Sequence, residues 1–254
     1  EKCLQKLNGM FAFALWDRRE CRLVLARDRM GEKPLYYGGS GDTFLFGSEL
    51  KALRRHPSWR AEVSRDSLTL LLRHGYIPAP WSIYQGIHKL PPAHFLVIED
   101  RGRSFGDPQC YWDLSQIADA GVQNQNLGSA ALIDEISDLV LNAVGRRMVA
   151  DVPLGAFLSG GYDSSLVAAA MQAQSSRPIR TFSIGFDEGE YNEAQHAKSV
   201  AKHLGTEHTE LYVTPDQAME VIPNLPDIYD EPFADSSQIP TFLISQLARK
   251  HVTI

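Results

Sequence analysis

Small, hydroxyl-bearing and acidic residues are concentrated in the stretch SGGYDSS, residues 159–165. The apolar run VPLGAF precedes this stretch and LVAAAMQ follows it, a pattern that predicts a buried strand and then a helix. Glycines let the backbone approach an anion closely, and a helix N-terminus presents unpaired N–H groups. The three serines add hydroxyl donors. The stretch therefore predicts a phosphate-binding loop.

An acidic residue inside this stretch indicates that the predicted phosphate site also binds a cation. The carboxylate of Asp163 would repel a phosphate unless a cation offset both charges, so it predicts a bound Mg²⁺. The alternative is an ordinary loop in which Asp163 or Ser164 caps the helix. We favour the phosphate site because the whole pattern lies between an apolar strand and an apolar helix. The sequence contains no GxxxxGK[ST], GxGxxG, HExxH or GxSxG motif that would indicate a competing chemistry.

The first part of the chain, down to about residue 112, predicts an antiparallel, β-rich fold. Short apolar runs alternate with turn signals, as in the predicted hairpin of residues 10–28 and a second pair of strands in residues 34–48. Ser48 is expected to cap a short helix over residues 49–56. A second helix is expected over residues 65–76, ending near Gly75.

The later part of the chain predicts an α/β fold with a parallel sheet. Residues 100–130 are polar and are the candidate linker. Beyond them an amphipathic helix, residues 131–148, is followed by alternating strands and helices, which imply crossover connections. The apolar run HVTI at residues 251–254 is β-like. Open α/β sheets bind ligands at the carboxyl ends of their strands, where SGGYDSS is predicted to lie.

Composition limits the classes of function. The chain has 254 residues, enough for one large domain or two ordinary ones, and its net charge of −6 argues against a nucleic-acid partner. No long apolar run predicts a membrane span. The three cysteines form no CxxC pair, which favours a reducing, cytoplasmic setting. Three histidines (His196, His203 and His208) lack zinc-site spacing and are expected on helix and strand surfaces.

These residues resemble a known family. The stretch from Ser159 to Ser164 is similar to the pyrophosphate loop (PP-loop) of the N-type ATP pyrophosphatases. Its flanks resemble the asparagine synthetase branch: LNGMFAFALWD, ARDRMGEKPLYY, FGSELKAL, YIPAP, KLPPAHFLVI and YWDL on one side, and TFSIGF, EYNEAQHAKSVAKHLGTEH and DEPFADSS on the other. The resemblance implies that residues 1–112 are the end of an Ntn-type glutaminase domain with the inter-domain region. Residues 113–254 would begin an adenine nucleotide alpha hydrolase-like, ATP-binding domain.

The resemblance also implies roles for individual residues. Asp163 would be the catalytic, Mg²⁺-binding carboxylate, and Ile184 and Gly185 would line the adenine pocket, although Ile184 also fits plain strand core. Glu231 and Asp235 would border the acceptor pocket, with a solvated acidic loop as the equal alternative. Arg27 and Asp28 are expected to form a structural ion pair rather than to act in catalysis. The residues implied to hold ATP are Phe157, Ser159, Gly160, Gly161, Asp163, Ser164, Ile184 and Gly185.

The implied activity is an ATP- and Mg²⁺-dependent amidotransferase. It would use glutamine or ammonia and convert a carboxylate, foremost aspartate, to an amide through an acyl-adenylate, with no nucleic-acid or membrane partner and with a homodimer as one option. The chain departs from the family pattern, since it lacks the N-terminal cysteine nucleophile and the downstream SGxGxDE motif, so we expect this chain alone to be inactive. Asp235 stands where aspartate-using members carry an arginine, and an aspartate there would repel a substrate carboxylate. The alternatives are an amidotransferase for a sugar carboxylate or a peptide, and a non-catalytic nucleotide-binding module.

Overall fold

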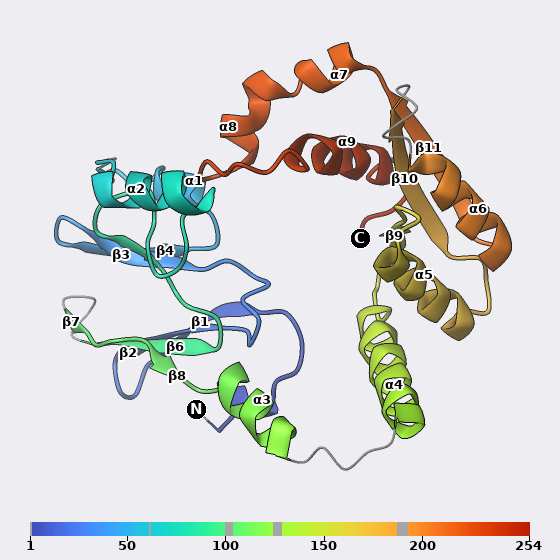
Figure 1. The fold of residues 1–254 in the computed structure, drawn as a ribbon. Helices are drawn as coiled ribbons and strands as arrows, with labels where there is room; N and C mark the ends of the chain where they lie inside the picture. Colours follow the sequence, from blue (N-terminus) through green and yellow to red (C-terminus); the bar gives the residue numbers. More distant parts are fainter. Residues whose placement is uncertain (1, 61, 100–103, 124–128, 187–192) are drawn as a thin grey trace. The chain divides into compact units, whose positions relative to one another are not determined.

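The computed structural model describes residues 2–60, 62–99, 104–123, 129–186 and 193–254, and the chain divides into two compact units (Figure 1). The first unit comprises Glu1–Gln125 and Pro226–Ala234, and the second comprises Asn126–Leu225 and Asp235–Ile254. The predicted fold class is confirmed, because antiparallel sheets form the first unit and a parallel sheet with helices forms the second. Within the described residues, each helix is too short or too polar to cross a bilayer.

Two antiparallel sheets make up the first unit. In one sheet the strands are ordered β1-β2-β6-β7, with β8 also paired to β6, and in the other the order is β4-β3-β5. The two predicted hairpins are confirmed as β1–β2 and β3–β4. The elements of this unit are η1 (Leu4–Lys6), β1 (Ala12–Asp17), β2 (Arg22–Arg27), β3 (Tyr36–Ser40), β4 (Thr43–Gly47), α1 (Leu50–Leu53), α2 (Arg65–His74), β5 (Ile87–Lys89), β6 (His94–Glu99), β7 (Ser104–Phe105), β8 (Gln109–Cys110) and α3 (Leu114–Gln123).

The period-2 alternation of the strands divides the core of this unit between the faces of its sheets. Leu25 of β2 packs with Tyr37 of β3 in the layer between the two sheets. The neighbouring Ala26 lies on the opposite face, in a separate cluster with Phe95. Tyr36 faces a third cluster, which contains Leu50 of α1. Each sheet is therefore buried on both sides.

The charged side chains of Asp28 and Arg27 hold the loop that follows β2 in place. The buried carboxylate of Asp28 accepts backbone N–H groups from Phe11, Met30, Glu32 and Lys33 at 2.9 to 3.2 Å. Burial alone would raise the pKa of this carboxyl, but the backbone donors outweigh it and hold the pKa below its usual value. The structural role expected for Asp28 is thus exercised through backbone groups.

Arg27 acts on the same loop from the other side. Its guanidinium donates to the carbonyl oxygens of Gly31, Lys33 and Leu90 at 2.6 to 2.8 Å. Burial lowers the pKa of Arg27, and the negative charge of Asp28 partly offsets that effect. The two side chains therefore fix the loop mainly by bonding to main-chain groups, in addition to attracting each other.

The segment expected to be a linker contains ordered structure in its described part, and the boundary between the two units, after Gln125, falls within it. Cys110 of β8 pairs with His94 of β6, and the hydroxyl of Tyr111 donates to the carbonyl of Arg27 at 2.8 Å. Helix α3 follows. The polar composition of this segment predicted a linker. Composition gives no information on hydrogen-bond partners that are distant in the sequence, such as those of Cys110 and Tyr111.

The second unit is a parallel sheet in the order β11-β10-β9 with helices on both faces. Apolar residues of α5 and α6 pack together on one face, and Phe182 of β10 packs against Ile244 of α9 on the other. The backbone of Ile254 accepts an N–H bond from Gly155, so the final residues run alongside β9. The elements are α4 (Ser129–Arg147), β9 (Gly155–Phe157), α5 (Tyr162–Gln174), β10 (Arg180–Phe186), α6 (Ala194–Leu204), β11 (Glu207–Val213), α7 (Pro215–Met219), η4 (Ile222–Asn224), α8 (Leu225–Ile228) and α9 (Gln238–Ala248).

Candidate nucleotide site

The predicted phosphate loop joins β9 to α5 at the carboxyl end of the parallel sheet. The N–H of Leu158 donates to the carbonyl of Phe182 at 2.8 Å, which is the last bond to the sheet before the chain turns away. Helix α5 then begins at Tyr162 with Gly161 as its N-cap. The unpaired N–H groups of the first helical turn are thus presented at the edge where open α/β sheets bind ligands.

Gly160 is required by the packing of this loop. Its φ of +82° lies in the left-handed region, and a Cβ at this position would lie 2.6 Å from the backbone nitrogen of Ala197 in α6. A Cβ would also lie 2.8 Å from the carbonyl carbon of His196. The glycine therefore lets the loop lie directly on α6.

Two serines of the loop bind each other. The Oγ atoms of Ser159 and Ser164 are 2.9 Å apart, and the Ser164 Oγ also accepts the N–H of Ser159 at 3.2 Å. The N–H of Gly161 donates to the Ser159 Oγ at 3.3 Å. These bonds fix the positions of both hydroxyls within the loop. The alternative that Asp163 or Ser164 caps the helix is wrong, because Gly161 occupies the N-cap.

Asp163 lies in the first turn of α5, and the residue is exposed. Across the described parts of the chain, no three His, Cys, Asp or Glu side chains gather into a metal site. A single exposed carboxylate such as that of Asp163 fits Mg²⁺, because proteins commonly hold this ion through one or two carboxylates together with substrate phosphates and water. Asp163 would therefore hold the ion only with a phosphate ligand present.

The residues expected around adenosine are brought to the same edge as the loop. Phe157, the last residue of β9, pairs in register with Phe182 of β10, and β10 continues to Phe186. Ile184 and Gly185 therefore extend beyond the end of β9. Ile184 also packs against the cluster under α9, so both interpretations of this residue, pocket wall and strand core, are compatible with its position.

Glu231 and Asp235 belong to different units. Glu231 packs in the first unit, where its carboxylate is bound by protein groups. Asp235 is exposed in the second unit, and its carboxylate accepts the N–H of Ser237 at 2.8 Å. The backbone and the hydroxyl of Ser237 hold the pKa of Asp235 below its usual value. Contact of either residue with a substrate stays a prediction.

The sequence reasoning missed a polar network beneath α6. His208 of β11 lies 2.9 Å from the buried hydroxyl of Thr181 and 3.1 Å from that of Ser183, so the expected surface position is wrong for this histidine. Burial lowers the pKa of His208, while the charge of Glu210 raises it and that of Lys198 lowers it further. The sequence segments TFS (181–183) and TEHTE (206–210) are rich in polar residues, but their contacts with each other could be recognised only once the register of β10 and β11 was known.

Comparison with known proteins divides the chain into two family regions, and the second of these contains the segment Pro226–Ala234 that packs in the first unit. Residues 1–112 match the family model described as a glutamine amidotransferase domain, and residues 135–254 match the one described as asparagine synthase. The chain is 37% identical to a protein of Methanocaldococcus jannaschii provisionally named glutamine-hydrolysing asparagine synthetase 2, over 99% of this chain and 48% of that protein. It is 32% identical to glutamine-hydrolysing asparagine synthetase 1 of Bacillus subtilis, over 100% of this chain and 39% of that protein. The chain thus spans about half of the first relative and less of the second.

Proposed function

The chain belongs to the asparagine synthase family, and from that premise we propose that it is part of a glutamine-hydrolysing, ATP-dependent amidotransferase. The reaction we propose converts L-aspartate, ATP and L-glutamine to L-asparagine, AMP, pyrophosphate and L-glutamate through an acyl-adenylate. The observation that supports it most is the SGGYDSS loop at the carboxyl end of β9, where N–H groups of α5 and two serine hydroxyls converge.

The loop would act by binding and orienting the phosphates of ATP. The α5 N–H groups and the hydroxyls of Ser159 and Ser164 would donate to phosphate oxygens, and donors already in place stabilise developing charge without reorganising. Asp163 would hold Mg²⁺, which when bound offsets the phosphate charge during release of pyrophosphate.

We propose that residues 1–112 serve as the C-terminal part of the glutaminase domain and residues 113–254 as the N-terminal part of the ATP-binding domain. The activity would belong to the intact protein, by which we mean a longer protein that contains this chain, and the 254-residue chain by itself would be inactive. A cytoplasmic location supplies ATP and keeps the three exposed, free cysteines reduced. A homodimer is one option for the assembly of the intact protein.

A second candidate function keeps the adenylation chemistry and changes the acceptor. The exposed carboxylate of Asp235 favours it, because a negative charge beside the acceptor site would oppose binding of aspartate, which carries a second carboxylate that does not react. The acceptor would then be a sugar carboxylate or a peptide that offers other polar groups to this loop.

One experiment separates these functions. The intact protein is given ATP, Mg²⁺ and ammonia with aspartate or with a panel of other carboxylates, and AMP and ADP are both quantified. AMP and pyrophosphate with aspartate alone support asparagine synthesis, whereas AMP with another acceptor supports the second function. ATP binding without AMP would indicate a non-catalytic nucleotide-binding module, and ADP as the product would refute the proposed loop chemistry.

A further inference from the structure

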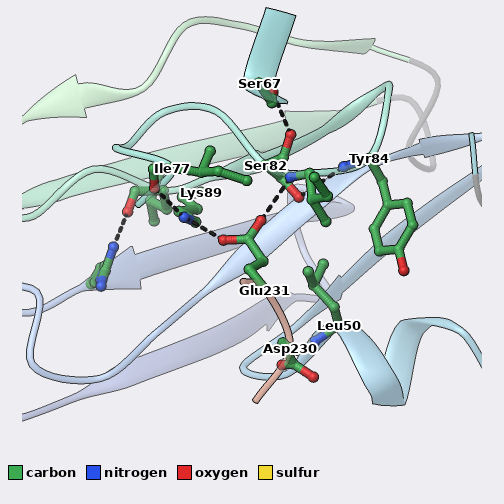
Figure 2. A network of polar contacts seen from close by, with 11 residues as sticks. Leu50, Ser67, Ile77, Ser82, Tyr84, Lys89, Asp230 and Glu231 are labelled. Atoms are coloured by element: carbon green, nitrogen blue, oxygen red, sulfur yellow. Dashed lines mark hydrogen bonds and ion pairs between the residues drawn. The ribbon is translucent and has the colours of Figure 1, made fainter. Parts of the chain in front are cut away.

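A short segment of the chain leaves the second unit and packs in the first. Residues Pro226–Ala234, here called the docked segment, belong to the first unit, although the residues on both sides of them belong to the second. Tyr229 and Phe233 of this segment contact each other edge to face at 4.9 Å between ring centroids. Two adjacent acidic residues of the segment, Asp230 and Glu231, accept backbone N–H groups from elsewhere in the unit (Figure 2).

Asp230 caps helix α1. Its carboxylate accepts the N–H groups of Leu50 at 2.6 Å and of Lys51 at 3.2 Å. The ammonium of Lys51 lies 3.9 Å from the same carboxylate and donates to the carbonyls of Asp227 and Ile228. The predicted cap by Ser48 is wrong, since Glu49 is the N-cap residue and the helix takes its capping carboxylate from the docked segment.

Glu231 is bound on both of its carboxylate oxygens. Oε1 accepts the N–H of Ile83 at 2.7 Å, and Oε2 lies 2.5 Å from the ammonium of Lys89. The two side chains of this ion pair are only 9% and 17% exposed. Lys89 also donates to the carbonyl of Ile77 at 2.5 Å, and burial together with the negative charge of Glu231 raises the pKa of the Tyr36 hydroxyl. Lys89 and Ile77 lie beside Glu231 in Figure 2, and the bonds to Ile83 and Lys89 leave its carboxylate little capacity for a ligand.

Backbone contacts complete the docking. The N–H of Ala234, the last residue of the segment, donates to the carbonyl of Gly75 at 2.6 Å, directly after α2. The segment also lines a cavity of about 360 Å³, together with Tyr36 and Tyr76. The segment is therefore held at Asp230, at Glu231 and at the point where the chain continues to Asp235.

The contacts of Asp230 and Glu231 do more than stabilise the docked segment, because they also fix its register. A buried ion pair contributes little net stability compared with apolar residues of similar volume, because both charges lose hydration. What it does supply is a single register, since only one placement of the segment satisfies Glu231, Ile83 and Lys89 together. Asp230 and Glu231 are adjacent and largely buried, and each accepts a backbone N–H from a different part of the unit. Each of the two acids therefore fixes the same register of the segment.

We propose that Asp230 and Glu231 are positioning residues for the acceptor half of the reaction. By holding the docked segment on the amidotransferase-family unit, they set the point from which the chain continues into Asp235–Ser237 and α9. This inference rests on the proposed function, and it replaces the direct substrate contact predicted for Glu231. Removing either carboxylate would loosen the acceptor-side loop without touching the phosphate loop or the glutamine chemistry.

The first test measures docking directly. Hydrogen–deuterium exchange is followed by mass spectrometry on the intact protein, in peptides that cover residues 50–54 and 226–234. Glu231→Gln and Asp230→Asn should each speed exchange in residues 226–234 about tenfold, while peptides from α5 stay unchanged. Glu49→Gln is the matched control, because that carboxylate borders the same cavity but is 60% exposed and lies 3.7 Å from Lys51. Unchanged exchange in both variants would overturn the proposal.

The second test measures positioning. In ammonia-dependent assays, the Glu231→Gln protein should show an acceptor KM raised about tenfold and a lower kcat for AMP formation, with the KM for ATP and the glutaminase rate unchanged. Lys89→Met should act in the same direction, and the Glu231→Gln/Lys89→Met double variant should be less than additive. Faster exchange with unaltered acceptor kinetics would overturn the positioning role. If the unaltered protein forms no AMP, the proposed function fails instead, and the exchange data alone decide whether the docking stands.

Discussion

The backbone N–H of Leu50 donates to Oδ2 of Asp230 at 2.6 Å, although the two residues are 180 positions apart in the sequence. Helix α1 is only four residues long, which is too short to be stable alone. Its N-terminus is satisfied by a residue that the chain reaches only after passing through the whole parallel sheet. The first unit is therefore completed by a segment that the later domain contributes.

This relationship predicts the effect of removing the cap. Asp230→Ala should lower the free energy of unfolding by about 1 kcal/mol, because two helical N–H groups lose their acceptor. Ser48→Ala should leave stability unchanged, since α1 begins at Leu50 with Glu49 as its N-cap residue. Urea unfolding of the two variants measures the difference. A loss of stability in Ser48→Ala with none in Asp230→Ala would show that the helix takes its cap from Ser48 after all.

Asp163 should separate the two half-reactions of the intact protein. Asp163→Asn removes the carboxylate proposed to hold Mg²⁺ and should lower AMP formation about 100-fold, because the phosphate charge is then less well offset. Glutaminase activity should be spared. The assay is ammonia-dependent AMP formation beside glutamate release, at several Mg²⁺ concentrations. A parallel loss of both activities would contradict the assigned role.

Gly160 should be intolerant of any side chain. Gly160→Ala places a Cβ 2.6 Å from the nitrogen of Ala197 at a positive φ, so we expect a loss of about 3 kcal/mol in the free energy of unfolding and weaker ATP binding. Gly161→Ala is the matched control for stability, because the nearest atom to its Cβ would be the Ser159 Oγ at an ordinary 3.4 Å. Thermal unfolding with and without Mg-ATP measures both effects, and a stable Gly160→Ala protein would argue against the tight loop–α6 contact.

His208 should make stability fall on mild acidification. Burial lowers the pKa of His208 in the folded state below the usual 6.5, so between these two values the unfolded chain binds the extra proton. The stabilisation is therefore present above pH 6.5 and is lost as the pH falls below it. His208→Gln should flatten this part of the profile in urea titrations from pH 7.5 to 5.5. His203→Gln, at an exposed position of α6, controls for loss of an imidazole in general, and a slope unchanged in His208→Gln would refute the assignment.

Patterns local in sequence determined much of this protein. Alternating apolar residues in β1 and β2, the end of α2 at Gly75, and the apolar runs around SGGYDSS each depend on neighbours a few positions away. The loop motif and its position between a strand and a helix were accordingly readable in advance, and so was the change from antiparallel to parallel sheets.

Tertiary structure alone decided the contacts between distant residues. Nothing near Asp230 or Glu231 in sequence indicates that their partners are Leu50, Ile83 and Lys89, and nothing near His208 indicates the hydroxyls of Thr181 and Ser183. The physical reason is that buried polar groups must find hydrogen-bond partners wherever the fold places them, and chain proximity does not govern that choice. The sequence alone therefore predicted a phosphate-binding loop at SGGYDSS, and the fold decided which acidic side chains bind other parts of the chain and hold it in place.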